Sequence, residues 1–244
     1  MMVRPIGLLA ACLALAACGG GPPEVAPQPA PDTVLAEAKS LYRQGQIGPA
    51  LERLTQLTSG GNARGAVAAE AYYYLGECNF AKGLYLEAAR EFRRVADGYA
   101  SHPLAPDGLL RAGDALAELW RHPELDPAYG ESSMTTYREL LARFPDSPAA
   151  RRAGLKLAAL ADRFAEKDYR NGIFYLRLKA HDSAIIYFRS VVANYAQSAF
   201  APRALLKLVE TYRTIGYAEE TKETCEHLRR FYPNAEGVNE TCPP

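Results

Sequence analysis

One spacing of small and large residues recurs along the chain, and it constrains the fold more than any other feature. In the segment Ala71–Val95, Gly76 is followed twelve residues later by Ala88 and four residues after that by Phe92. Apolar and small residues recur every three or four positions on both sides of Gly83, which predicts two helices joined at that glycine. A small residue on each helix lets the two helices approach closely.

The same spacing returns four more times. It is found at Gly172, Ala184 and Phe188, at Ala38, Ala50 and Leu54, at Val209, Thr221 and Cys225, and, with about eight extra residues between the helices, at Gly113 and Tyr137. This pattern resembles the tetratricopeptide repeat, a helix–turn–helix unit of about 34 residues. We therefore predict an all-α fold, a tetratricopeptide-repeat superhelix of about five helix-turn-helix pairs whose concave side is a binding surface. A separate long helix, about Ala149 to Lys167, is expected before the unit of Gly172.

The first residues have the pattern of a secretion signal that ends at a cysteine. Met1 to Ala17 carries one charge and an apolar stretch too short to span a bilayer. Leu15-Ala16-Ala17-Cys18 resembles the bacterial lipobox, so Cys18 is the expected lipidation site; the alternative is an ordinary cleaved signal with an incidental cysteine. Two acyl chains would give lasting membrane anchorage.

These features divide the chain into four parts. Residues 1–17 are the predicted lipoprotein signal peptide, and 18–31 are the lipidated cysteine with a tether rich in glycine and proline. Residues 32–234 hold the five repeats, and 235–244 form a loose C-terminal tail. Three cysteines lie in the body, at 78, 225 and 242. Two alternatives stay open: a Cys225–Cys242 disulfide, or Cys225 packed in a helix with Cys242 on the tail.

Composition and motifs argue for a binding protein. Twenty-eight basic residues balance twenty-eight acidic ones, so nothing points to nucleic acid as a partner. The catalytic motifs of serine hydrolases, phosphate-binding loops and zinc proteases do not occur. The histidines are scattered, at His102, His122, His181 and His227, where a metal site needs them clustered. We therefore expect no enzyme activity, no metal and no cofactor.

Three stretches in the middle of the chain narrow the interpretation. They are DPAY (Asp126–Tyr129), YRELLARFPDS (Tyr137–Ser147) and DRFAEKDYRNGIFY (Asp162–Tyr175). With the lipobox and five repeats, they resemble the BamD family, the lipoprotein component of the machinery that assembles β-barrels in the outer membrane. One departure is Gly130, where the family usually has alanine, so the start of that helix is open.

The resemblance implies a function, a location and partners. It implies a scaffold anchored by lipid to the periplasmic face of the outer membrane, which binds unfolded β-barrel outer-membrane proteins and the BamA-type barrel subunit. Two alternatives remain: a periplasmic repeat adaptor of the Tol-Pal and cell-division system, and a lipid-anchored accessory to a cell-wall enzyme. The lipobox, the proline-rich tether and the lack of a heptad run weigh against the first of these.

Two sets of site residues follow from repeat geometry and from the resemblance. First-helix positions on the concave side give a candidate peptide groove of Lys39, Tyr42, Arg43, Tyr73, Glu77 and Phe80. Cations beside aromatic rings suit an extended peptide that ends in an aromatic residue and a carboxylate; the alternative is that Lys39 and Arg43 are simply solvated. In the BamD family the C-terminal repeats bind the barrel subunit, which places docking within Phe174–Tyr232. There we expect a strip of Arg203, Leu206, Glu210 and Arg213 to dock; the alternative is an ordinary solvent-facing helix.

Overall fold

A computed structural model describes residues 29–59, 61 and 63–243. The chain divides into Met1–Ala30 and Pro31–Pro244, and every described helix belongs to the second unit. Cys18 and the predicted signal peptide lie outside the described residues, as does most of the predicted tether. The helices are α1 (Pro31–Arg43), α2 (Ile47–Ser59), α3 (Gly65–Ala81), α4 (Tyr85–Gly98), α5 (Ala105–Glu118), α6 (Ala128–Arg143), α7 (Pro148–Arg177), α8 (His181–Asn194), α9 (Phe200–Ile215), α10 (Ala218–Phe231) and α11 (Val238–Thr241).

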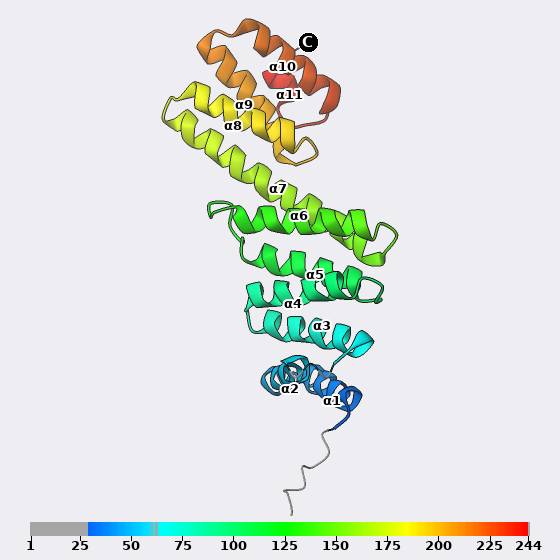
Figure 1. Cartoon of the computed structure of the whole chain (residues 1–244). Helices are drawn as coiled ribbons and strands as arrows, with labels where there is room; N and C mark the ends of the chain where they lie inside the picture. The colour runs from blue at the N-terminus through cyan, green and yellow to red at the C-terminus, as the bar shows by residue number, and fades with distance from the viewer. Residues whose placement is uncertain (1–28, 60, 62, 244) are drawn as a thin grey trace, which may run out of the picture. The chain divides into compact units, whose positions relative to one another are not determined.

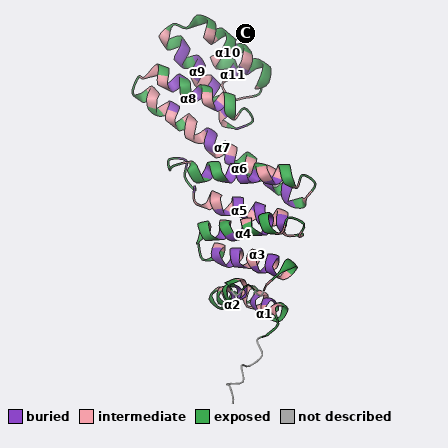
Figure 2. Ribbon diagram, in the orientation of Figure 1, coloured by how far each residue is buried: buried purple, intermediate pink, exposed green. Residues whose placement is uncertain are grey.

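Helices α1 to α10 form five antiparallel pairs that stack in chain order (Figure 1). The part of the chain that the structure describes contains no strand, so the predicted all-α fold is confirmed. Each helix packs mainly on its neighbours in sequence, and Figure 2 shows the buried residues on the faces that the helices turn toward one another. This nearest-neighbour arrangement is the property that defines repeat proteins.

The repeat spacing is explained by three contacts between a glycine and an aromatic ring. A Cβ atom added to Gly76 would lie 2.7 Å from the ring of Phe92, and Cβ atoms on Gly113 and Gly172 would clash in the same way with Tyr137 and Phe188. All three rings are almost fully buried. The missing side chain therefore makes the space that the aromatic ring fills, and we call each pair a glycine–aromatic lock.

Helix α7 differs from the expected arrangement because it is one continuous helix of 30 residues. The stretch predicted at about Ala149 to Lys167 and the first helix of the Gly172 unit are joined, because no proline lies between them. Its first half packs with Leu109 and Leu140 of α5 and α6, and its second half packs with the helices from α8 onward. α7 thus belongs to two neighbouring parts of the stack.

The structure also explains Gly130, the position at which this sequence has glycine in place of the alanine that was expected. Helix α6 begins at Ala128, whose amide N–H donates to Asp126 at 3.0 Å, directly after the Asp-Pro element. A Cβ atom on Gly130 would clash with the indole of Trp120, which is completely buried. Glycine is needed at this position because the tryptophan takes the space.

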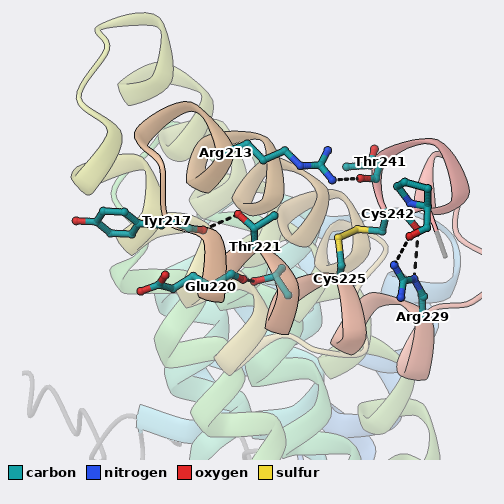
Figure 3. Close-up of a disulfide and its surroundings, with 10 residues drawn as sticks. Arg213, Tyr217, Glu220, Thr221, Cys225, Arg229, Thr241 and Cys242 are labelled. Atoms are coloured by element: carbon teal, nitrogen blue, oxygen red, sulfur yellow. Dashed lines mark hydrogen bonds between the residues drawn. A yellow bond between two sulfur atoms is a disulfide. The ribbon is translucent and has the colours of Figure 1, made fainter.

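The expectation of a loose C-terminal tail was wrong for the described residues. Cys225 and Cys242 form a disulfide, with their Cα atoms 5.4 Å apart (Figure 3). Val238 and Cys242 are 2% and 1% exposed, and α11 contacts both α9 and α10. Because the disulfide joins the segment to α10, residues 235–243 are part of the folded body.

Candidate peptide-binding groove

The first helices of neighbouring repeats lie next to one another, and their polar side chains meet there. α1 contacts α3, α5 contacts α7, and α7 contacts α9. Glu77 of α3 is the centre of the contacts between repeats. Arg111 of α5 donates to both of its carboxylate oxygens, from Nε at 2.7 Å and from Nη2 at 2.8 Å, and the hydroxyl of Tyr42 in α1 donates at 3.3 Å. Residues from three repeats are thereby joined at one carboxylate.

A second carboxylate continues these contacts toward α7. Asp114 accepts a hydrogen bond from the hydroxyl of Tyr137 at 2.7 Å and one from Arg111 at 3.3 Å, and Lys156 Nζ lies 2.9 Å from it. Glu77 and Asp114 side chains are only 13% and 11% exposed. We call this chain of contacts, from Tyr42 through Glu77, Arg111 and Asp114 to Lys156, the polar ladder.

Burial and charge in the polar ladder shift the pKa values of its members. Burial and then the charge of Glu77 raise the pKa of Tyr42 to about 12. Burial and the neighbouring Asp114 likewise raise the pKa of Tyr137. Burial alone would lower the pKa of Arg111, but its hydrogen bonds to Glu77 reverse the effect and raise it. The phenols are therefore neutral and the guanidinium is charged at neutral pH.

A hollow of about 320 Å³ beside the polar ladder opens to solvent. Its lining combines apolar and charged side chains. The guanidinium of Arg111 lies over the ring of Phe80, 4.2 Å from its centroid. The lining residues are Phe80, Arg111, Asp114, Ala117, Glu118, Tyr137, Lys156, Ala159, Leu160 and Arg163.

The predicted groove residues are only partly brought together. Tyr42, Glu77 and Phe80 meet through Arg111. Lys39 instead forms an ion pair with Glu70, at 2.5 Å. Arg43 is exposed, and its Nε donates to the backbone carbonyl of Lys39. Tyr73 packs edge-to-face on Phe92, with ring centroids 5.5 Å apart, so it belongs to the core as well.

Arg111, Asp114 and the residues of α7 in the hollow were not predicted from the sequence. Gly113 follows Gly76 by 37 residues, and the same offset places Asp114 at the position of Glu77. Applying the concave register to the third repeat would therefore have found Asp114. Lys156, Leu160 and Arg163 could not be found in this way, because the first half of α7 has no counterpart in the other repeats.

The predicted docking strip on α9 is partly occupied by the chain itself. Arg213 donates to the carbonyl of Thr241 at 2.6 Å, and Leu206 is half-buried in the C-terminal core cluster. Glu210 pairs with Lys207, and the guanidinium of Arg203 lies 5.5 Å from the ring centroid of Phe200. Arg203 is exposed, and no hydrogen bond or ion pair joins it to residues 235–243.

Two other findings concern only the residues that the structure describes. They contain no group of three or more histidine, cysteine, aspartate or glutamate side chains placed to hold a metal ion. None of their helices combines the length and the apolar character needed to span a membrane.

A stack of helix pairs built on this spacing defines a tetratricopeptide-repeat protein. A solved structure of such a repeat protein from Bacteroides fragilis shares the fold, with a TM-score of 0.52, 14% identity and coverage of 86% of this chain and 95% of that one. Residues 28–228 match the model of the YfiO family, described as outer membrane lipoprotein. The chain belongs to this family.

Three curated relatives are each called outer membrane protein assembly factor BamD. The Caulobacter vibrioides protein is 29% identical over 65% of this chain and 52% of its own length. The Rickettsia prowazekii protein is 32% identical over 42% of this chain and 41% of its own length. These two matches thus span about half of each relative or less. The Vibrio cholerae protein is 27% identical over 89% of this chain and 93% of its own length.

Proposed function

We propose that this protein is a scaffold of the β-barrel assembly machinery that binds unfolded outer-membrane proteins in the groove of its middle repeats. The names of its relatives and the description of its family support this assignment. The observation that carries it is the hollow beside the polar ladder, whose lining combines apolar and charged side chains. That combination suits a short peptide.

The chemistry of the hollow favours a peptide that ends in an aromatic residue and a free carboxylate. Phe80, Ala117 and Ala159 supply apolar surface for a ring, and Lys156 and Arg163 supply positive charge beside it. The side chain of Lys156 is 44% exposed, so it reaches solvent while it contacts Asp114. A charge-assisted hydrogen bond to a terminal carboxylate would select the end of a chain over an internal segment.

Crosslinking tests where the peptide binds. A photoreactive side chain at Ala159, which is exposed and lines the hollow, should capture a peptide from the C-terminus of an outer-membrane barrel. The same group at Ile186, which is 66% exposed on the second helix α8, is the control. Capture at Ile186 with none at Ala159 would contradict binding of the peptide in the groove.

The lipid anchor at Cys18 and the docking of a BamA-type subunit are further parts of the proposal. A lipid on Cys18 would keep the scaffold on the periplasmic face of the outer membrane, next to the barrel being assembled. Mass spectrometry of the mature N-terminus should find an acylated Cys18, and Cys18→Ser should prevent it. An unmodified N-terminus at Cys18 in the wild type would refute the anchor.

Arg203 is the best residue with which to test docking. Arg213 also holds Thr241, so a change at Arg213 alters the C-terminal segment as well as the surface. We expect Arg203→Glu to reduce co-purification with the BamA-type subunit while helical content stays unchanged. The control is Lys222→Glu, at an exposed position of α10, which should have no effect. Wild-type recovery of the subunit with Arg203→Glu would place the interface elsewhere.

A further inference from the structure

The segment after α10 begins as the segments after other second helices do. Tyr99, Tyr195 and Tyr232 follow α4, α8 and α10 with φ angles of −137°, −136° and −134°. Each amide N–H donates to the carbonyl four residues earlier, and helix then resumes at Ala105, Phe200 or Val238. α11 therefore starts where the first helix of a sixth repeat would start.

The buried residues of this segment keep the same register. Val238 lies six residues after its tyrosine, as do Ala105 and Ala201, and Cys242 lies ten residues after it, as do Leu109 and Leu205; all six are buried. α11 has only four residues, however. It is a one-turn equivalent of a first helix, and its second buried position is a cysteine bonded to α10.

Hydrogen bonds from two arginines add to the disulfide (Figure 3). Arg213 donates to Thr241, and Arg229 donates to the carbonyls of Cys242 and Pro243 at 3.2 and 2.5 Å. Both arginines are exposed, so water competes for these contacts. Residues 235–243, which we call the latch, also cover part of the α9 strip: a Cβ atom on Gly237 would lie 3.6 Å from Leu206.

The non-covalent contacts of the latch are too few to keep it ordered. A helix of one turn does not form by itself, because nucleation is unfavourable. Fixing the backbone of nine residues costs conformational entropy at each of them. Against this stand the burial of Val238 and Cys242 and hydrogen bonds from exposed side chains. The covalent bond is the one contact strong enough to decide the balance.

We propose that the Cys225–Cys242 disulfide holds the latch closed, and that reduction of this bond releases residues 235–243, uncovers Leu206 and frees Arg213 from Thr241. A dithiol reductant forms its own disulfide in this step. Two electrons and two protons pass to Cys225 and Cys242, which become thiols. In an oxidising compartment the latch closes, and in a reducing one it opens. The redox state of the protein thus controls access to part of the α9 strip.

Hydrogen exchange of the full chain tests the latch. We compare the oxidised protein, the protein reduced with dithiothreitol, and the double variant Cys225→Ser/Cys242→Ser. The amides of Val238–Cys242 should exchange at least about tenfold faster in the last two, while α9 and α10 keep their protection. Unchanged exchange in the latch would overturn the proposal. Loss of protection throughout α9 and α10 would also overturn it, because the bond would then hold the whole repeat.

A thiol at position 206 tests whether the strip is uncovered. Leu206→Cys should be alkylated about tenfold faster in the Cys225→Ser/Cys242→Ser background than in the oxidised protein. Cys78 is the control for opening of the whole fold. It is completely buried and burial raises the pKa of its thiol to about 11, so it should react slowly in both backgrounds. Equal rates at position 206 in the two backgrounds, mapped by mass spectrometry, would contradict the release.

Discussion

The second and fifth repeats use the same spacing in different ways. In the second repeat, Phe92 follows Gly76 by sixteen residues and fills the space that the glycine leaves. In the fifth repeat, Val209 and Cys225 stand at these two places, and the cysteine is bonded to Cys242. In the second repeat, the glycine–aromatic lock holds its own two helices together. In the fifth repeat, the following segment packs on the helices and is joined to them by the disulfide.

This difference separates the two candidate binding surfaces. The hollow beside the polar ladder lies on the second to fourth repeats, whose helices are fixed by glycine–aromatic locks. Side chains on such a rigid support keep the geometry that recognition needs. The strip on α9 lies on the latched repeat and is partly covered. We therefore expect the groove to be permanently available and the strip to depend on the latch.

Removing the ring of a lock should have the largest effect on stability. Phe188→Ala should lower the free energy of unfolding by about 3–5 kcal/mol, because the ring is completely buried and leaves a cavity. Phe231→Ala in the fifth repeat is the control, since that ring is 57% exposed, and it should change stability by less than about 1 kcal/mol. If urea denaturation gave equal losses of unfolding free energy for the two variants, the lock would contribute no more to stability than an exposed ring.

Breaking the disulfide should have a smaller effect. The bond joins residues separated by 17 positions, and a loop of that size stabilises a fold by about 3 kcal/mol at most. The release of the latch returns freedom to the native state, so Cys225→Ser/Cys242→Ser should cost less than this. Dithiothreitol should lower the stability of the wild type to that of the variant. A loss greater than that of Phe188→Ala would contradict the comparison.

Two glycines in α7 should respond in opposite directions to the same change. Gly172→Ala places a Cβ against Phe188 and should destabilise by about 1–3 kcal/mol. Gly154→Ala meets no atom within 4 Å and should stabilise by about 0.5–1 kcal/mol through helix propensity. Thermal denaturation of the two variants gives the signs. Stabilisation by Gly172→Ala would refute the lock in the fourth repeat.

Acid should weaken the middle repeats slightly through Glu139. Burial raises the pKa of this carboxyl group, but hydrogen bonds from Arg93 and Arg143 outweigh it and hold the pKa below the ordinary 4.5. The contribution is therefore present above pH 4.5 and is lost as the pH falls through the lower folded value. We expect Glu139→Gln to cost under about 1 kcal/mol at pH 7 and nothing in strong acid. An equal cost at both pH values would contradict the assigned charge.

Sequence alone predicted the repeats because two of the three locks share one spacing and the third differs from it only by an insertion. Gly76, Gly113 and Gly172 mark three first helices, and weaker versions at Ala38 and Val209 mark the other two. The continuity of α7 was missed because helical periodicity does not show whether two adjacent helical stretches join. The latch was missed because a segment with prolines on both sides has the composition of a loop, and its order depends on a covalent bond.

The groove was harder to predict than the fold, because its charges are paired across repeats. The sequence placed Lys39 and Glu77 on the concave side but not their partners Glu70 and Arg111. Spacing within one repeat says nothing about which ion pairs form with the next. The part of the groove on α7 depends on a helix that has no counterpart in the other repeats.

The affinity for a terminal carboxylate tests the central claim most directly. Titration with a peptide that ends in phenylalanine, as the free acid and as the amide, compares the wild type with Lys156→Glu and with Lys222→Glu, which changes the net charge equally. The wild type and Lys222→Glu should bind the free acid about three- to tenfold more tightly than the amide, and Lys156→Glu should lose this preference. Equal affinity of the wild type for both peptides would contradict the account, as would an equal loss of preference in the two variants.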